Sequence, residues 1–273
     1  PPRTPREKFA ANLTAIRTLK SIEKRMADGG PHANGEEQEI LAQYSGWGGL
    51  SDAFEPNKDS WHSEYTELKS LLTEEEYAAA RSSTLTAFYT PPEVIDAMYT
   101  ALRKMGVGAG TILEPSMGVG AFFGQSHSYL YEPNTRLFGV ELDSLTGRIA
   151  RQLYQKANIQ ITGFEKADLP DSFFDVVIGN VPFGDYSVVD PQYNRLHFKI
   201  HDYFFAKSID KLRTGGIIAF ITTSGTLDKK SEEVRRYINA RCDFIGAVRL
   251  PDSTFKSAGT KAMADIIFLQ KRD

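Results

Sequence analysis

From residue 84 to residue 273, short apolar runs alternate with amphipathic segments, and this alternation restricts the folds open to the chain. Six runs have the character of strands: residues 111–115, 136–143, 173–180, 216–222, 244–250 and 264–271. Segments of helical periodicity separate most of these runs, which predicts an α/β fold with a parallel, doubly wound sheet. No helix separates the last two runs, so we expect those two strands to pair antiparallel.

Residues 1–85 are predicted to form a helical layer ahead of the sheet. Apolar residues recur at steps of three and four along the first helix, at Phe9, Leu13, Ile16, Leu19, Ile22 and Met26. A second helix is expected over residues 36–44, and Thr73 with Glu76 forms a capping box that begins a third. In the segment TPPE, Thr90 is the predicted N-cap of a helix that runs to about residue 105.

The composition argues against several classes of protein. No apolar run reaches the roughly 20 residues that cross a bilayer, and no basic start followed by an apolar stretch marks a signal peptide. The one cysteine, Cys242, cannot form an intrachain disulfide, which fits a reducing, cytoplasmic location. His197 and His201 lie four residues apart, but no Cys or further His nearby completes a zinc site. Because the sequence begins without Met, we expect a piece of a longer protein.

The net charge of −3 is unevenly distributed along the chain. From Arg195 onward there are 15 Lys and Arg against 9 Asp and Glu, so the C-terminal third is the better candidate for contact with a polyanion. A solvated surface with scattered lysines is the alternative interpretation. Four basic residues are candidates for contacts with phosphates: Lys229, Lys230, Arg235 and Arg236.

A glycine-rich segment, EPSMGVGAFFG at residues 114–124, follows a predicted strand and precedes a predicted helix. Glycines in such a loop let a ligand approach the backbone. The dinucleotide pattern G-x-G-x-x-G is not met, and no Lys or Arg lies between Gly106 and Tyr131, which favours a ligand without phosphate. Glu141 ends the next strand, where an acid can bind a ribose diol. Its alternative role is a surface acid that caps the next helix. Together, the loop and the acid indicate a ligand that contains a nucleoside.

Four motifs occur in the order FYTPPEVIDAMY, EPSMGVGAFF, GVELD and GNVPFG. In order and spacing they resemble the gamma class of DNA methyltransferases that act on adenine N6, over residues 86–273. The resemblance implies a Rossmann-like methyltransferase fold with a mostly parallel seven-stranded sheet, in the order 3-2-1-4-5-7-6 with the seventh strand antiparallel. The segment YSGWGGL in the N-terminal part is similar to the methylase region of large helicase-fused proteins of plasmids and conjugative elements. Residues 1–85 would then be a helical region, and residues 86–273 the catalytic domain.

The resemblance also implies S-adenosylmethionine as cofactor and assigns residues to it. Those expected at its methionine end are Tyr89, Thr90 and Pro91, together with Glu114, Pro115, Ser116 and Gly118 of the glycine loop. Glu141 would bind the ribose hydroxyls. The acid that binds the adenine amino group in this family falls here on Phe164, so we assign that role to the adjacent Glu165. Phe204 matches the aromatic residue that covers the cofactor adenine, and its alternative role is a core position.

GNVPFG contains the residues to which the resemblance assigns catalysis: Asn180, Val181, Pro182 and Phe183. An exocyclic adenine amine is a poor nucleophile, because its lone pair is delocalised into the ring. The Asn180 side-chain oxygen and the backbone carbonyl of Val181 would accept its two hydrogens, and Phe183 would stack on the flipped base. The family has proline where this chain has Val181. Any residue supplies the carbonyl, and Pro182 still biases Val181 toward extended conformations, so we expect retained but slower activity.

The resemblance implies DNA, single- or double-stranded, as the methyl acceptor, in a restriction-modification system or a mobile element. The chain ends at Asp273, where family members usually continue into a target-recognition domain, so we expect further domains or a partner, such as a helicase, to supply target selection. RNA or another planar nitrogen acceptor is an alternative substrate. A catalytically weakened module that binds cofactor and nucleic acid, and a nicotinamide-dependent oxidoreductase, are alternatives from other classes.

Overall fold

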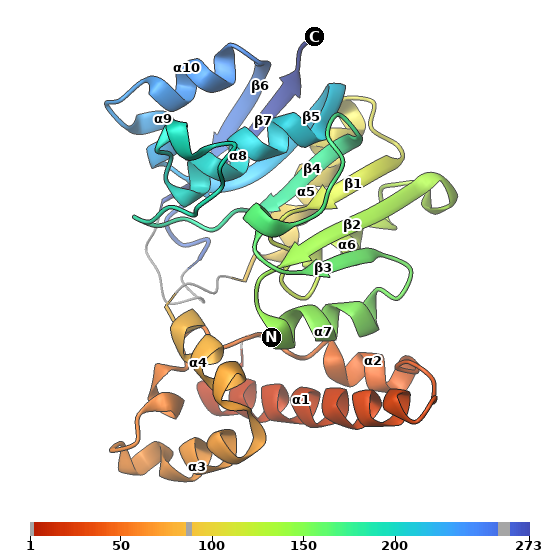
Figure 1. The fold of residues 1–273 in the computed structure, drawn as a ribbon, viewed down its shortest axis with the longest axis vertical. Coiled ribbons are helices and arrows are strands. Elements are labelled where there is room, and N and C mark those ends of the chain that lie inside the picture. The colour runs from red at the N-terminus through yellow and green to blue at the C-terminus, as the bar shows by residue number, and fades with distance from the viewer. Residues whose placement is uncertain (1–2, 86–88, 256–262) are drawn as a thin grey trace.

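The computed structural model describes residues 3–85, 89–255 and 263–273 (Figure 1). Phe88, the first residue of the motif FYTPPEVIDAMY, lies outside the described residues. The predicted α/β arrangement is confirmed, because the described residues form a seven-stranded sheet in the order β3-β2-β1-β4-β5-β7-β6. The strands are β1 (Gly110–Glu114), β2 (Thr135–Glu141), β3 (Asn158–Ile161), β4 (Phe174–Asn180), β5 (Leu212–Thr223), β6 (Cys242–Arg249) and β7 (Ala264–Lys271).

Strand directions also follow the prediction. β3, β2, β1, β4 and β5 pair in parallel, and β7 pairs antiparallel with both β5 and β6. β7 is therefore the one reversed strand of the described sheet. Because β1, β2 and β4 are parallel neighbours, their carboxyl ends lie at one edge of the sheet, where ligands bind in open α/β folds.

β3 is the strand that no apolar run indicated. It has four residues, NIQI, of which only Ile159 is buried. Its backbone pairs with β2 from Phe138↔Asn158 to Glu141↔Ile161. A short edge strand needs few buried side chains, so its sequence carries little hydrophobic signal.

Helices cover both faces of the sheet. Alternate residues of a strand point to opposite faces. In β1, Ile112 belongs to the core cluster that holds Ile95 and Met98, whereas Leu113 belongs to the cluster that holds Phe205 and Ile209. The helices of this part are α5 (Pro92–Lys104), α6 (Ala121–Ser126), α7 (Ser144–Leu153), α8 (Ile200–Lys211), α9 (Gly225–Asp228) and α10 (Glu233–Asn239).

The predicted helical layer is confirmed as four helices, α1 (Pro5–Ala27), α2 (Gly35–Leu41), α3 (His62–Leu71) and α4 (Glu74–Ser83), with two short 3₁₀ turns. The predicted apolar face of α1 is buried from Phe9 to Ile22, and Thr73 with Glu76 forms the expected capping box. In Figure 1 this layer lies below α7, on the side of the molecule away from β5 to β7. Among the described residues, no helix combines the length and apolar character that a membrane span requires.

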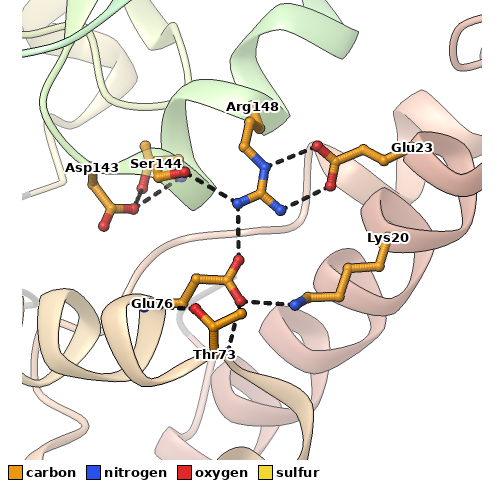
Figure 2. A network of polar contacts seen from close by, with 8 residues as sticks. Lys20, Glu23, Thr73, Glu76, Asp143, Ser144 and Arg148 are labelled. Carbon is orange, nitrogen blue, oxygen red and sulfur yellow. Dashed lines mark hydrogen bonds and ion pairs between the residues drawn. The ribbon is translucent and has the colours of Figure 1, made fainter. Parts of the chain in front are cut away.

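Arg148 of α7 joins this layer to the sheet part (Figure 2). Its guanidinium donates two hydrogen bonds to Glu23 of α1, at 2.9 and 2.8 Å, and one to Glu76 of α4, at 2.8 Å. Glu76 is only 7% exposed and also accepts from Lys20 at 2.7 Å. Leu145 and Ile149 of α7 are buried in the same apolar cluster as the α1 face. The N-terminal layer therefore shares with α7 both its core and a partly buried network of charges.

The predicted role of Thr90 as a helix cap is wrong. α5 begins at Pro92, its N-cap is Pro91, and no side chain caps it. Pro92 at the first helical position has no N–H to satisfy and a φ suited to a helix start, and the Val94 N–H donates to the Pro91 carbonyl at 3.1 Å, so the helix begins without a side-chain cap. The Thr90 hydroxyl is left for another contact.

Candidate active site

Three polar residues end neighbouring strands: Glu114 on β1, Glu141 on β2 and Asn180 on β4. Hydrogen bonds connect the loops that follow these strands. The Gly118 N–H donates to the Glu141 carboxylate at 3.1 Å, and the Ser116 hydroxyl donates to the Asn180 backbone carbonyl at 2.8 Å. The fold therefore brings together the glycine loop, the acid of β2 and the asparagine of β4, as the sequence predicted.

The glycine loop has two glycines in backbone conformations that other residues rarely adopt. Gly118 has φ +56° and Gly120 has φ +91°. A Cβ on Gly118 would meet no described atom within 4 Å, whereas one on Gly120 would lie 2.3 Å from the Tyr154 ring. Gly120 is therefore required for packing, and Gly118 leaves its backbone open to a ligand.

Glu114 and Glu141 form a pair of acids that lack a cationic partner among the described side chains. Burial raises the pKa of Glu114 well above its usual value, and the charge of Glu141 raises it further. Burial, followed by the charge of Asp143, raises the pKa of Glu141 to about 7. Glu114 is 2% exposed, and its Oε2 atom has no hydrogen-bond partner within the described residues. A ligand that carries an ammonium group and a diol would satisfy this pair, as an amino-acid end and a ribose do.

The side-chain amide of Asn180 lies at the carboxyl end of β4. Its Nδ2 atom donates to the Thr90 hydroxyl at 3.2 Å. Its Oδ1 atom is buried and has no hydrogen-bond partner within the described residues. A buried acceptor without a donor is unfavourable by about 1–3 kcal/mol, so this oxygen is placed to accept a hydrogen bond from a bound group.

Val181, the residue that departs from the family motif, is 2% exposed and belongs to the core cluster on the α8 face. Its N–H donates to the Ile221 carbonyl at 3.0 Å, which continues the β4–β5 ladder past the end of β4. Pro182 is half-buried, and Phe183, also half-buried, packs against the same cluster. Val181 therefore supplies a backbone hydrogen bond that proline could not make.

The loop from residue 184 to residue 199 is anchored by groups that the sequence did not single out. Asp190 accepts hydrogen bonds from the Tyr203 hydroxyl at 2.6 Å and from the Lys207 ammonium at 3.0 Å. Burial raises the pKa of Asp190, but these two donors outweigh it, so the pKa lies below its usual value. In the sequence, the only indication of this anchor is the four-residue spacing of Tyr203 and Lys207, which places both residues on one face of α8.

The two residues assigned to the cofactor adenine have different surroundings. Glu165 is half-buried, and its carboxylate folds over Gly163, where a Cβ would lie 2.2 Å from Oε1. Phe204 is 5% exposed, and its ring centroid lies 4.9 Å from that of Phe164. The Phe204 ring is thus part of the core, and both cofactor roles stay predictions.

The remaining assigned residues adjoin, in sequence, the contacts described above. Tyr89 is 54% exposed and directly precedes Thr90, while Pro91 and Pro115 flank the contacts described above. Leu142, which the sequence did not indicate, is 75% exposed directly after Glu141. Apolar side chains exposed beside the acid give a ligand's flat ring a surface to cover.

The residues proposed for phosphate contacts are mostly engaged within the protein. Lys229 pairs with Asp202, Arg236 pairs with Glu232, and Arg235 donates to two backbone carbonyls. These internal contacts weaken the case for a phosphate-binding cluster on α9 and α10.

The strand order, the open glycine loop and the acid that ends β2 define the class of fold, a Rossmann-like methyltransferase fold. Residues 71–273 match the family described as N-6 DNA Methylase. The chain therefore belongs to this family, the adenine-specific DNA methyltransferases that use S-adenosylmethionine. The match begins at residue 71, ahead of the predicted domain boundary at residue 86.

Among curated proteins, the chain is 27% identical over 267 residues to the "Defense against restriction protein B" of Escherichia phage P1. That alignment covers 96% of this chain and 10% of the phage protein. The chain thus spans about a tenth of the length of this relative.

Solved structures share the fold. A putative class I S-adenosylmethionine-dependent methyltransferase from Listeria monocytogenes has a TM-score of 0.58 and 18% identity, covering 97% of this chain and 88% of that one. The type I restriction-modification methyltransferase subunit from Streptococcus thermophilus also has a TM-score of 0.58, with 19% identity, covering 93% of this chain and 65% of that one. At these identities the likeness establishes the fold alone.

Proposed function

We propose that this chain catalyses methyl transfer from S-adenosylmethionine to the N6 amino group of adenine in DNA, with Asn180 as the central catalytic residue. The observation that carries the proposal is the buried, unpartnered Oδ1 of Asn180 at the carboxyl end of β4. An adenine amino group can supply the hydrogen-bond donor that this oxygen lacks. Membership of the N-6 DNA methylase family supports the same reaction.

Bound S-adenosylmethionine supplies a methyl group activated by its sulfonium. The residues of the chain act on the acceptor. Asn180 Oδ1 and the Val181 carbonyl each accept a hydrogen bond from the adenine amino group, which localises the lone pair on its nitrogen. Phe183 stacks on the base. Positioning and electrostatics then supply most of the rate enhancement, and no strong general base is needed.

The residues around Gly118 are proposed to hold the cofactor. Glu114 would pair with its ammonium group, Glu141 would accept from its ribose hydroxyls, and Glu165 would bind the adenine amino group. The pair of acids supports this assignment, since both carboxyls have raised pKa values that a bound cation would lower.

Target selection is proposed to reside outside this chain, in further domains or in a partner such as a helicase. The phage P1 relative is named for defense against restriction. Adenine methylation within a restriction site would serve the same end here, in the cytoplasm where DNA is modified. The division into a helical region (residues 1–85) and a catalytic domain (residues 86–273) is also a proposal, and the shared core around α7 indicates that the two fold together.

The function is tested by methyl transfer from radiolabelled S-adenosylmethionine to single- and double-stranded DNA and RNA, followed by identification of the methylated nucleoside. N6-methyladenine in DNA is the expected product. N6-methyladenine found only in RNA would show that the substrate is RNA and not DNA. Cofactor binding without transfer to any acceptor would indicate the catalytically weakened binding module.

Replacing Glu141 by Gln is expected to weaken S-adenosylmethionine binding at pH 8 by at least about tenfold, because a charge-assisted hydrogen bond is lost. The pKa of Glu141 in the folded protein is about 7, against an ordinary value of 4.5. As the pH falls from 8 to 6, protonation of this carboxylate therefore weakens its hydrogen bonds with the ribose hydroxyls. Wild-type affinity should therefore decrease over that range, while the affinity of Glu141→Gln stays flat. Calorimetry at both pH values measures this.

The same substitution has the opposite effect on stability. Between the unfolded and folded pKa values the folded chain binds more protons, so the free energy of unfolding falls as pH rises through that window. Glu141→Gln should then be more stable than wild type at pH 8, by on the order of 1–2 kcal/mol. Glu132→Gln, at an exposed acid beside the opposite end of β2, is the matched control. Wild-type cofactor affinity in Glu141→Gln would contradict the assignment.

Replacing Val181 by Pro is expected to lower the free energy of unfolding by about 1 kcal/mol, since the hydrogen bond to the Ile221 carbonyl is lost. Methyl transfer should stay within about tenfold of wild type, because a conformational bias of this kind is worth about 1 kcal/mol. Chemical denaturation and single-turnover rates measure the two effects. An inert wild type beside an active Val181→Pro variant would show that the valine abolishes preorganisation.

A further inference from the structure

Two residues that the sequence assigned to the cofactor form hydrogen bonds with Asn180. The Thr90 hydroxyl accepts from Asn180 Nδ2 at 3.2 Å, and the Ser116 hydroxyl donates to the Asn180 backbone carbonyl at 2.8 Å. Thr90 is only 6% exposed, so water competes little for this hydrogen bond. One residue thus contacts the amide and the other the backbone of the same asparagine.

The bond to Thr90 holds the side-chain amide of Asn180 with Nδ2 toward the hydroxyl. A primary amide can rotate by half a turn, which exchanges Oδ1 and Nδ2 at nearly unchanged shape. With Nδ2 toward Thr90, Oδ1 is left as the open acceptor. In the reverse orientation the Nδ2 hydrogens would face the hydrogens of an amino substrate, and donor would meet donor. The Thr90 hydroxyl can hydrogen-bond either end of the amide, so its role is to hold the amide in place, and Oδ1 is the free acceptor in the orientation that the structure shows.

The bond from Ser116 fixes the point from which that amide projects. It holds the peptide carbonyl of Asn180 at the turn where β4 ends, next to the backbone of Val181. Because Val181 carries the second proposed acceptor on its own backbone, a shift of this peptide would displace both acceptors together. Ser116 lies in the glycine loop and Thr90 directly ahead of α5, so the two contacts come from segments far apart in the sequence.

We propose that Thr90 and Ser116 are positioning residues for the Asn180 amide: Thr90 holds its side chain, and Ser116 holds the peptide from which that side chain projects. The proposal rests on the proposed function. It predicts that loss of the Thr90 hydroxyl impairs the methyl-transfer step and leaves cofactor affinity intact, whereas a cofactor contact would do the reverse.

The test compares Thr90→Val, which keeps the shape and removes the hydroxyl, with Thr90→Ser, which keeps the hydroxyl, and with Ser116→Ala. Single-turnover rates are measured with saturating S-adenosylmethionine and an adenine-containing DNA, and cofactor Kd by calorimetry. Thr90→Val is expected to slow transfer by about 10- to 100-fold, with cofactor Kd within about twofold of wild type, since no cofactor contact is removed. Thr90→Ser should restore most of the rate, and Ser116→Ala should slow transfer by a smaller factor.

A second readout does not depend on activity. In protein labelled with ¹⁵N-asparagine, the Asn180 side-chain NH₂ signal, assigned by its absence in Asn180→Ala, should exchange slowly with solvent in wild type and in Thr90→Ser. In Thr90→Val that protection should be lost. If Thr90→Val does not fold, Thr90→Ala, which also lacks the hydroxyl, replaces it in both measurements with the same expected results.

Two results would overturn the inference: a wild-type rate in folded Thr90→Val, or a weakened cofactor Kd with an unchanged rate at saturation. Failure of the proposed function looks different. In that case the wild type transfers no methyl group to any acceptor, while the exchange readout still reports whether Thr90 holds the amide.

Discussion

Asn180→Ala is expected to reduce methyl transfer to DNA by about a thousandfold or more, the effect typical of removing a preorganised group at the reacting centre. The variant loses the buried acceptor Oδ1 and leaves Thr90 without the donor it has in the folded protein. Alanine adds no new clash at the end of β4, so the fold should persist. Cofactor affinity should change little, since Glu114 and Glu141 lie on other strands.

Single-turnover transfer and cofactor calorimetry on the same preparation separate catalysis from binding. Asn134→Ala is the matched control, because this exposed asparagine precedes β2 at the end of the strand opposite Glu141. The control should transfer methyl groups at the wild-type rate. Residual activity of Asn180→Ala within tenfold of wild type would show that the reaction does not depend on this amide, and the proposed mechanism would then be wrong.

Arg148→Met is expected to lower the free energy of unfolding by about 2–3 kcal/mol, because it leaves the buried Glu76 carboxylate with fewer compensating donors. For a chain of this size that corresponds to a fall in Tm of roughly 5–10 °C. The guanidinium is the only described group that bonds both Glu23 and Glu76, so the variant also removes this polar link from α7 to α1 and α4 (Figure 2). Thermal and chemical unfolding measure the loss.

The effect of Arg148→Met should depend on pH in a defined direction. Burial raises the pKa of Glu76, but hydrogen bonds from Lys20, Thr73 and Arg148 lower it to about 2, against an ordinary value of 4.5. The stability that Glu76 contributes is therefore present above about pH 5 and is lost as the pH falls toward 2. The difference between wild type and Arg148→Met should be larger at pH 7 than at pH 3.5.

Arg236→Met provides the matched control for this prediction. Arg236 pairs with Glu232 one helical turn away, and both side chains are well exposed. Such surface pairs contribute about 0.3–0.5 kcal/mol, so this variant should unfold almost as wild type does. Equal stability of the two variants would mean that the N-terminal layer does not depend on the Arg148 network.

Local sequence patterns predicted most of the fold. Strand runs, helical periodicity and the Thr73–Glu76 capping box depend on neighbours two to four residues apart, which a sequence displays directly. The resemblance gave the strand order, which the sheet confirms. β3 was not located because its four residues bury so little apolar surface, and Thr90 was misassigned because its partner lies 90 residues away.

The sequence by itself determined which residue types stand at the ends of β1, β2 and β4, since a polar residue after an apolar run marks the edge of a parallel sheet. Only the tertiary structure decided what those residues do to one another. It buried Glu114 beside Glu141, turned the Thr90 hydroxyl toward the Asn180 amide, and joined Arg148 to Glu23 across 125 residues. Such contacts depend on where distant segments meet, and hydrogen bonds and charges act over a few ångströms of space whatever the distance along the chain.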